Sequence, residues 1–156
     1  MKTKKAINLN LSEQERKTLR SKRIKLSSLI NFATDELEQL LDVSKNRARE
    51  ISALIEFQQI PSIGIRFAED LIFLGYYSLN QLKTKNGAEL TDIYEKKKGY
   101  KTDPCVEDQF RLVVHFSRTQ DFTKNWWDFT SERKKFRASF GYPKDRPQKS
   151  WTDLLG

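Results

Sequence analysis

The stretch that most constrains this chain lies near its middle, where a proline and small residues separate two apolar helical patterns. It reads Ile60-Pro61-Ser62-Ile63-Gly64 and continues as Ile65-Arg66-Phe67-Ala68-Glu69-Asp70-Leu71. Pro61 cannot continue a preceding helix, and Gly64 permits the positive φ that a reversal within a few residues needs. Ile63 is expected to point inward as a plug, and Ala68 to let the second helix approach the first. The stretch predicts two helices joined by a tight turn.

The same pattern occurs twenty residues upstream, in Leu40-Leu41-Asp42-Val43-Ser44-Lys45-Asn46-Arg47-Ala48-Arg49-Glu50-Ile51. The two stretches align position by position, with these pairs: Val43 with Ile63, Ser44 with Gly64, Ala48 with Ala68, Glu50 with Asp70 and Ile51 with Leu71. An apolar plug, small turn residues and an alanine in this spacing are typical of a helix-hairpin-helix motif. Residues 31–82 are therefore predicted to form a tandem pair of such units, of which the first is degenerate.

Capping patterns and apolar spacing predict helices along the rest of the chain. Ser12 with Glu15 forms a capping box, and Thr34 is expected to cap the next helix. Asp103 before Pro104 predicts an N-cap followed by proline at the first helical position. The expected helices cover residues 13–20, 35 onward, 45–58, 66–74, 79–82, 88–97 and 104–117. The expected fold class is all-α, a tandem helix-hairpin-helix domain with additional helices packed at its C-terminal side.

The formal net charge of +8 suggests a polyanionic partner, and the charge is unevenly distributed. Residues 1–30 carry nine Lys and Arg against two Asp and Glu, whereas residues 31–60 carry three against six. This favours three segments: a basic N-terminal arm and helix over 1–30, the tandem domain with its C-terminal helices over 31–129, and a basic aromatic tail over 130–156. The first eleven residues are expected to be poorly ordered. The cations of the helix after them favour a solvated face over a dedicated nucleic-acid arm.

Aromatic residues are interspersed with basic residues from Asp121 to the end of the given sequence. Aromatics among cations can hold single-stranded nucleic acid by stacking, but near a chain end they more often pack onto the domain, and packing is the favoured interpretation. The stretch from Tyr142 to Gly156 is expected to be mobile. The Trp126-Trp127 pair is interpreted as core aromatics, although its specific role, like that of Cys105, is left open.

Residue types for metal, redox or membrane chemistry are sparse. The single cysteine, Cys105, excludes an internal disulfide, and the single histidine, His115, is expected to be a half-buried helix residue. The sequence therefore predicts no metal site, no cofactor and no catalytic residue. It contains no apolar run of membrane-spanning length and no signal peptide, so the expectation is a cytoplasmic location without a membrane partner.

Four features follow one another as they do in a known bacterial family. These are the hairpin and helix from Ile60 to Gly75, the short helix from Ser78 to Leu82, the Asp103-Pro104-Cys105 helix start and the Trp126-Trp127-Asp128 triplet. From about Leu37 to Phe129 the chain resembles the helix-hairpin-helix family called "pathogenicity locus", some members of which are labelled mitomycin-resistance proteins. The resemblance implies a cytoplasmic bacterial protein with an all-α tandem fold similar to DNA-binding modules. One departure is Ser62, where the usual hairpin has a second glycine.

The leading functional hypothesis is sequence-independent DNA binding, linked to DNA repair or damage tolerance. The N-terminus of the helix after the second turn would offer unpaired amides to a backbone phosphate. As similar hairpins do, the turn could also hold a monovalent cation that bridges its carbonyls and the phosphate. The candidate contact residues are Ser62, Ile63, Gly64 and Arg66 of the second turn, with Lys45 and Arg47 of the first. Because the first turn carries Asp42 where phosphate would approach, the second is expected to bind and the first mainly to pack.

Two alternatives belong to other classes of function. The acidic first unit and the missing glycine favour a protein-protein interaction or dimerisation domain without DNA binding. A DNA glycosylase or lyase would need a catalytic aspartate after the hairpin, and Asp92 and Asp103 lie downstream. The chain is short for that fold and shows no separate substrate-pocket half, so an enzyme is not expected.

Overall fold

The computed structural model describes residues 5–155, and the predicted all-α class is confirmed. Its contacts divide the chain into two compact units, Met1–Leu79 and Asn80–Gly156, which are described separately below. Within the described residues there is no strand, and the only β-type pairing is a single bridge between Lys101 and Ser150. None of the helices over 5–155 is both long and apolar enough to cross a membrane.

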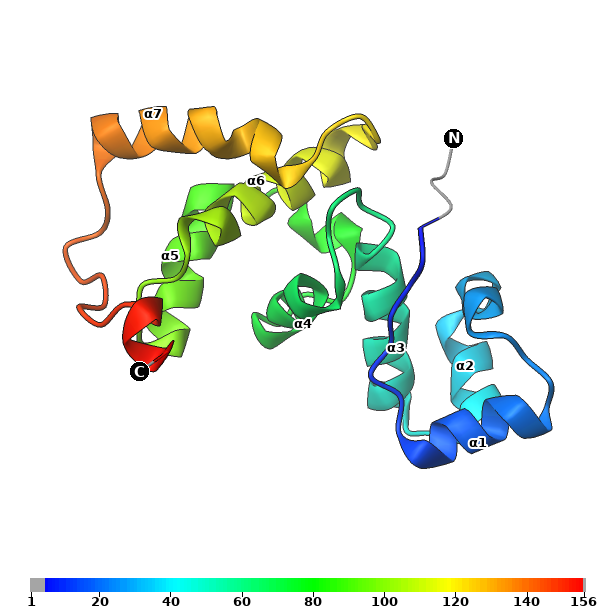
Figure 1. The fold of residues 1–156 in the computed structure, drawn as a ribbon. Helices are drawn as coiled ribbons and strands as arrows, with labels where there is room; N and C mark the ends of the chain where they lie inside the picture. The colour runs from blue at the N-terminus through cyan, green and yellow to red at the C-terminus, as the bar shows by residue number, and fades with distance from the viewer. Residues whose placement is uncertain (1–4, 156) are drawn as a thin grey trace. The chain divides into compact units, whose positions relative to one another are not determined.

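The first unit is built around α3 (Figure 1). Its elements are α1 (Glu13–Ser21), the 3-10 helix η1 (Leu26–Asn31), α2 (Thr34–Leu41), α3 (Lys45–Phe57) and α4 (Ile65–Phe73), and the 3-10 helix η2 (Leu79–Leu82) begins where the unit ends. Helix α3 packs against η1, α2 and α4. Its apolar positions Ala48, Ile51, Leu54 and Phe57 recur at helical spacing and are fully buried. The amphipathic period of this one helix thus organises the unit.

Local capping residues set the boundaries of these helices. Ser12 and Glu15 form the predicted capping box of α1, with the Glu15 amide donating to Ser12 Oγ at 3.1 Å. The N-cap predicted at Thr34 is wrong, because Ala33 takes that position. Glu36 Oε1 accepts from the Ala33 amide at 2.9 Å, and the Thr34 hydroxyl pairs with Ser52 of α3 at 2.9 Å. Thr34 therefore links two helices instead of capping one.

The N-terminal arm contradicts the expectation of poor order from residue 5 onward; residues 1–4 lie outside the described part. The arm runs beside α3 (dark blue in Figure 1). Leu9 and Leu11 are buried, and Asn8 exchanges two hydrogen bonds with Gln58, at 3.1 Å and 2.7 Å. Gln58 is itself only 1% exposed. The alternating Leu9 and Leu11 bury apolar surface that a count of charges alone does not reveal.

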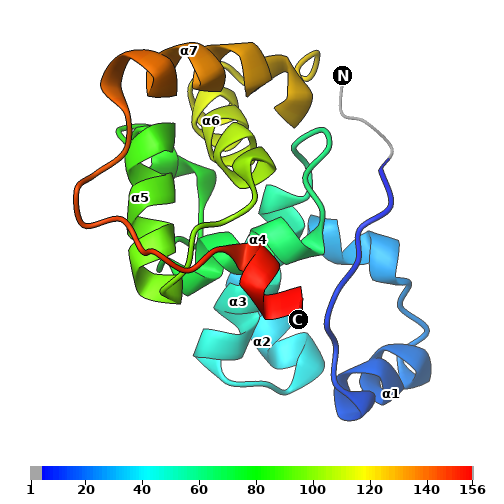
Figure 2. The same cartoon turned by 60° about the vertical axis from the view of Figure 1, so that its left-hand side comes forward.

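The second unit contains three longer helices, with α7 lying across α6 (Figures 1 and 2). Its elements after η2 are α5 (Gly87–Lys98), α6 (Pro104–Thr119), the 3-10 helix η3 (Trp126–Phe129), α7 (Thr130–Phe140) and the 3-10 helix η4 (Trp151–Leu155). Asn86 caps α5, and Asp103 caps α6 ahead of Pro104 as predicted. Gly99 ends α5 at φ +82°, a conformation that glycine adopts without strain.

Helices α5 and α6 approach closely at Gly87. A Cβ at this glycine would lie 2.8 Å from Arg111 Cα and 2.9 Å from its backbone nitrogen. Gly87→Ala is therefore expected to destabilise the fold by about 1–3 kcal/mol, because the backbone of α6 must move aside. Urea unfolding measures this cost. Gly64→Ala, where a Cβ meets nothing within 4 Å, is the control. An equal cost for both substitutions would contradict the close approach.

A cluster of buried ion pairs joins α7 to α6, and neither α7 nor this cluster is predicted by the sequence. Asp108 of α6 is fully buried and accepts from Arg133 Nε at 2.7 Å and from the Thr130 hydroxyl at 2.8 Å. Glu107, only 2% exposed, accepts from Arg137 Nε at 2.8 Å and from Arg111 Nη2 at 2.9 Å. Three arginines thus neutralise two adjacent buried carboxylates, as buried charges require.

Residues 142–155, expected to be mobile, are attached to the unit, and Gly156 lies outside the described part. The Lys101 amide donates to the Lys149 carbonyl and the Trp151 amide to the Lys101 carbonyl, both at 2.7 Å. Arg146 pairs with Glu95, a buried carboxylate of α5, at 2.8 Å. Tyr142 lies against this same guanidinium, whose centre is 3.5 Å from the ring centroid. Arg146 of this stretch is therefore the partner of a buried acid and not part of a free basic surface.

The Trp126-Trp127 pair is not a core pair, which corrects the favoured interpretation. The two rings meet edge to face with centroids 5.4 Å apart, but Trp127 is 54% exposed and Trp126 is only half-buried. The pair opens η3, whose start is fixed by a hydrogen bond of 2.8 Å from the Asn125 amide to Asp128. Its position at the start of a short surface helix leaves one ring in solvent.

Candidate nucleic-acid interface

The two predicted turns share their backbone conformation at aligned positions. Asp42 has φ +53° and Ser62 has φ +63°, both in the left-handed region, and each stands two residues before an N-cap. The positive φ predicted for Gly64 is wrong, because Gly64 has φ −101° and ψ −174° and is the N-cap of α4. The left-handed residue lies two positions earlier than expected, at Ser62, where a non-glycine residue bears the strain.

The N-terminus of α4 has no side-chain cap. Gly64 is exposed and offers no side-chain oxygen to the first-turn amides. At the aligned position of the first turn, Ser44 Oγ accepts from the Arg47 amide at 3.1 Å and so caps α3. The two turns have the same backbone form but different chemistry, since only the second lacks a side-chain oxygen that caps its helix.

The predicted residues of the second turn divide between packing and exposure. Ile63 is fully buried and is the plug of the turn. The Ser62 hydroxyl donates to the Pro61 carbonyl at 2.6 Å, so it stabilises the turn itself. Gly64 and Arg66 are exposed, and within residues 5–155 the Arg66 side chain has no hydrogen-bond or ion-pair partner. The structure therefore brings an open helix N-terminus and an available cation together.

Of the two residues predicted from the first turn, Lys45 is exposed and Arg47 is not available. All five N–H groups of the Arg47 guanidinium donate hydrogen bonds. Nε and Nη2 donate to the Glu15 carboxylate at 2.9 and 2.8 Å, and Nη2 also donates to the Asn10 carbonyl at 3.0 Å. Nη1 donates to Asn10 Oδ1 at 3.2 Å and to the Glu50 carboxylate at 2.8 Å. Arg47 holds the arm, α1 and α3 together. We therefore leave it out of the proposed contact site.

The Arg47–Glu15 pair gives the first unit a predictable pH dependence. The hydrogen bonds from Arg47 hold the pKa of Glu15 below its ordinary value, against the opposing effect of burial. A carboxyl with a lowered pKa stabilises the fold above its unfolded pKa, and the stabilisation is lost as pH falls through the lowered folded pKa. The difference in unfolding free energy between wild type and Glu15→Gln is thus expected to shrink on acidification. Urea unfolding followed by circular dichroism measures it, and a pH-independent difference would contradict the prediction.

Lys5 is a candidate site residue that sequence reasoning missed. Its ammonium donates to the Ile60 carbonyl at 3.1 Å and makes a second, shorter contact with the Ile63 carbonyl. Burial lowers the pKa of Lys5. In the sequence it is one of several lysines in a basic arm, and no local pattern distinguishes it. Only the folded chain places a cation from the arm on the second turn.

The other residues weighed for chemistry have structural partners. Asp103 Oδ1 accepts from the Cys105 amide at 2.9 Å, and Asp92 pairs with Arg137 at 3.0 Å. His115 Nε2 lies 3.4 Å from Asp121 Oδ2 and is half-buried as expected. Burial raises the pKa of the Cys105 thiol, which disfavours the reactive thiolate. A search of residues 5–155 finds no group of three side chains suited to hold a metal ion.

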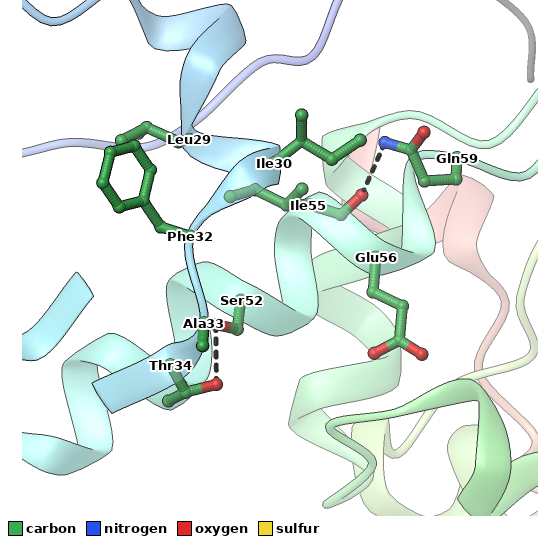
Figure 3. A pocket seen from close by; sticks show the side chains of 9 residues that line it. All are labelled: Leu29, Ile30, Phe32, Ala33, Thr34, Ser52, Ile55, Glu56 and Gln59. Carbon is green, nitrogen blue, oxygen red and sulfur yellow. Dashed lines mark hydrogen bonds between the residues drawn. The ribbon is translucent and has the colours of Figure 1, made fainter. Parts of the chain in front are cut away.

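A separate hollow of about 260 Å³ lies between η1 and α3 (Figure 3). Leu29, Ile30, Phe32 and Ile55 form its apolar part, and Gln59 is tied back to the Ile55 carbonyl at 3.1 Å. Glu56 stands at the other side, where burial raises its pKa and the Leu79 amide donates to it at 3.1 Å. Gln59 and Glu56 in its wall hydrogen-bond to the backbone of the same unit, so the hollow is not taken as a candidate binding site.

Comparison with known proteins identifies a family. No curated protein and no solved structure matches the chain. A family model described as "Pathogenicity locus" matches residues 50–135, more than half of the chain. The matched stretch contains the whole second turn and α4, whereas the first turn precedes it. This chain is therefore a member of the "Pathogenicity locus" family.

Proposed function

We propose that the chain is a DNA-binding module without sequence specificity, in which the second turn acts as a helix-hairpin-helix turn and holds a backbone phosphate. The observation that carries the proposal is the uncapped N-terminus of α4 at Gly64, with the exposed Arg66 on its first turn. Helix N-termini favour anions because their amides and dipole point at the ligand. The shared left-handed positions Asp42 and Ser62 support the tandem relationship of the two turns.

The proposed contact is to phosphate rather than to bases. Gly64 allows a phosphate to approach the amides, and Arg66 adds a direct charge. Contacts of this kind position a duplex without selecting its sequence. We also propose that this module belongs to a bacterial cytoplasmic protein that serves DNA repair or damage tolerance and has no catalytic step of its own.

Replacement of Arg66 gives the first test of this function. Arg66→Ala is expected to lower affinity for single-stranded, duplex and junction DNA and to reduce the salt slope on duplex by about one, because one phosphate contact is lost. Fluorescence anisotropy over a salt series measures both quantities. Lys135→Ala removes an exposed charge from α7 and is the matched control. Equal salt slopes for wild type and Arg66→Ala on duplex DNA would show that Arg66 does not contact a phosphate.

A protein-protein interaction or dimerisation domain is the second candidate. The observation that favours it is a set of large apolar side chains in solvent in the second unit: Phe140 at 75%, Leu154 at 61% and Leu155 at 76% exposure. Exposed apolar surface often marks an interface. Sedimentation of the wild type and of a Phe140→Ser, Leu155→Ser variant would distinguish a dimer held by these side chains from a monomer that binds DNA.

A further inference from the structure

Two backbone carbonyls of the second turn accept hydrogen bonds from the same side chain, Lys5. The carbonyl oxygens of Ile60 and Ile63 converge on one point, the Lys5 ammonium. Backbone carbonyls that converge in this way replace the hydration shell of potassium or of an ammonium group. Both isoleucine side chains are fully buried, so the carbonyl positions are fixed by the core. Lys5 thus occupies a rigid site and not a chance surface position.

The arm that delivers Lys5 is anchored at several points. The two-way Asn8–Gln58 pair fixes its middle, and Asn10 Nδ2 donates to Glu69 of α4 at 2.9 Å. The neighbouring Leu9 is buried. These contacts bind the arm to the end of α3 and to α4, the two elements that the turn joins.

We infer that Lys5 is the built-in cation of this turn: its ammonium fills the site between the Ile60 and Ile63 carbonyls and directs its remaining N–H to a DNA phosphate. The inference rests on the proposed function. An ammonium has three donors, and the carbonyls use two. Among residues 5–155 no third acceptor for Lys5 is present. A phosphate at the turn would therefore meet a charged donor without needing a metal ion.

The test compares potassium chloride with tetramethylammonium chloride at equal ionic strength, using a fluorescent duplex. Tetramethylammonium has no N–H and is too large for the carbonyl site. Wild type is expected to bind equally in both salts. Lys5→Met is expected to lose about tenfold affinity in tetramethylammonium, to recover partly in potassium, and to show a salt slope lower by about one. Lys4→Met removes the same charge from the arm and is expected to show neither the cation dependence nor the lower slope.

Three results would overturn the inference: potassium-dependent binding by wild type, unchanged binding by Lys5→Met, or tighter binding by Lys5→Met, which would mean that the arm masks the turn. If wild type binds no DNA, the proposed function fails. The unfolding free energy in the two salts then tests separately whether Lys5 fills a cation site. Potassium should then stabilise Lys5→Met relative to tetramethylammonium and leave wild type unchanged. No such difference would show that the carbonyls do not form a cation site.

Discussion

Asp108→Ala is expected to destabilise the second unit by about 3–5 kcal/mol. Its carboxylate is fully buried and is the acceptor for Arg133 and for the Thr130 hydroxyl. Removal of one partner of a buried pair leaves the other charge without compensation, and this costs more than the pair contributes. Urea unfolding followed by tryptophan fluorescence measures the effect, because all three tryptophans lie in the second unit.

Two variants test the cause of this loss. Glu132→Gln breaks the exposed pair with Arg111, in which the Glu132 side chain is 61% exposed, and is expected to cost at most about 1 kcal/mol. Asp108→Ala combined with Arg133→Met removes both charges and is expected to recover part of the stability. If Asp108→Ala costs no more than Glu132→Gln, the buried cluster does not hold α7 to α6.

Gly64→Val is expected to reduce DNA affinity at least about tenfold while the protein remains folded. The valine side chain would stand beside the open amides of α4, where a phosphate oxygen would bind, and charged hydrogen bonds of this kind contribute about 1.5–3 kcal/mol. The backbone of Gly64 is extended and a Cβ meets nothing within 4 Å, so the substitution brings no clash. Anisotropy with duplex DNA measures affinity, and combination with Arg66→Ala should deepen the loss.

Ser44→Val at the aligned position of the first turn is the matched control. It removes the Ser44 cap of α3 and is expected to cost about 1 kcal/mol of stability while DNA affinity is unchanged. Gly64→Val should therefore lower DNA affinity without unfolding the protein, whereas Ser44→Val should lower stability without changing DNA affinity. Loss of affinity in both variants, or in neither, would argue against a phosphate site at the second turn.

Local patterns in the sequence were sufficient for most helices of the fold. The Ser12–Glu15 capping box and the Asp103-Pro104 start each depend on atoms within three residues, and each is present in the structure. The all-α class follows from them. The Thr34 cap failed because its hydroxyl found a partner in α3, a contact that no local pattern contains.

The parts that could not be predicted depend on contacts between residues far apart in sequence. Helix α7 has no buried residue, and its Arg133 and Arg137 pair with buried carboxylates of α6. Its sequence therefore resembles a basic tail. The same is true of the candidate site. Exposure of Arg66, the use of every N–H of Arg47 and the position of Lys5 are all outcomes of folding that spacing alone does not determine.

An amide NMR titration with a short duplex tests the central claim most directly. If the second turn holds phosphate, the largest shifts on addition of DNA should fall on the amides from Ser62 to Phe67, at the uncapped start of α4, and should diminish as salt is added. The amides of the capped first turn, from Asp42 to Arg47, should move much less. Shifts confined to α1 or α7, or none at all, would contradict the account and favour a protein partner.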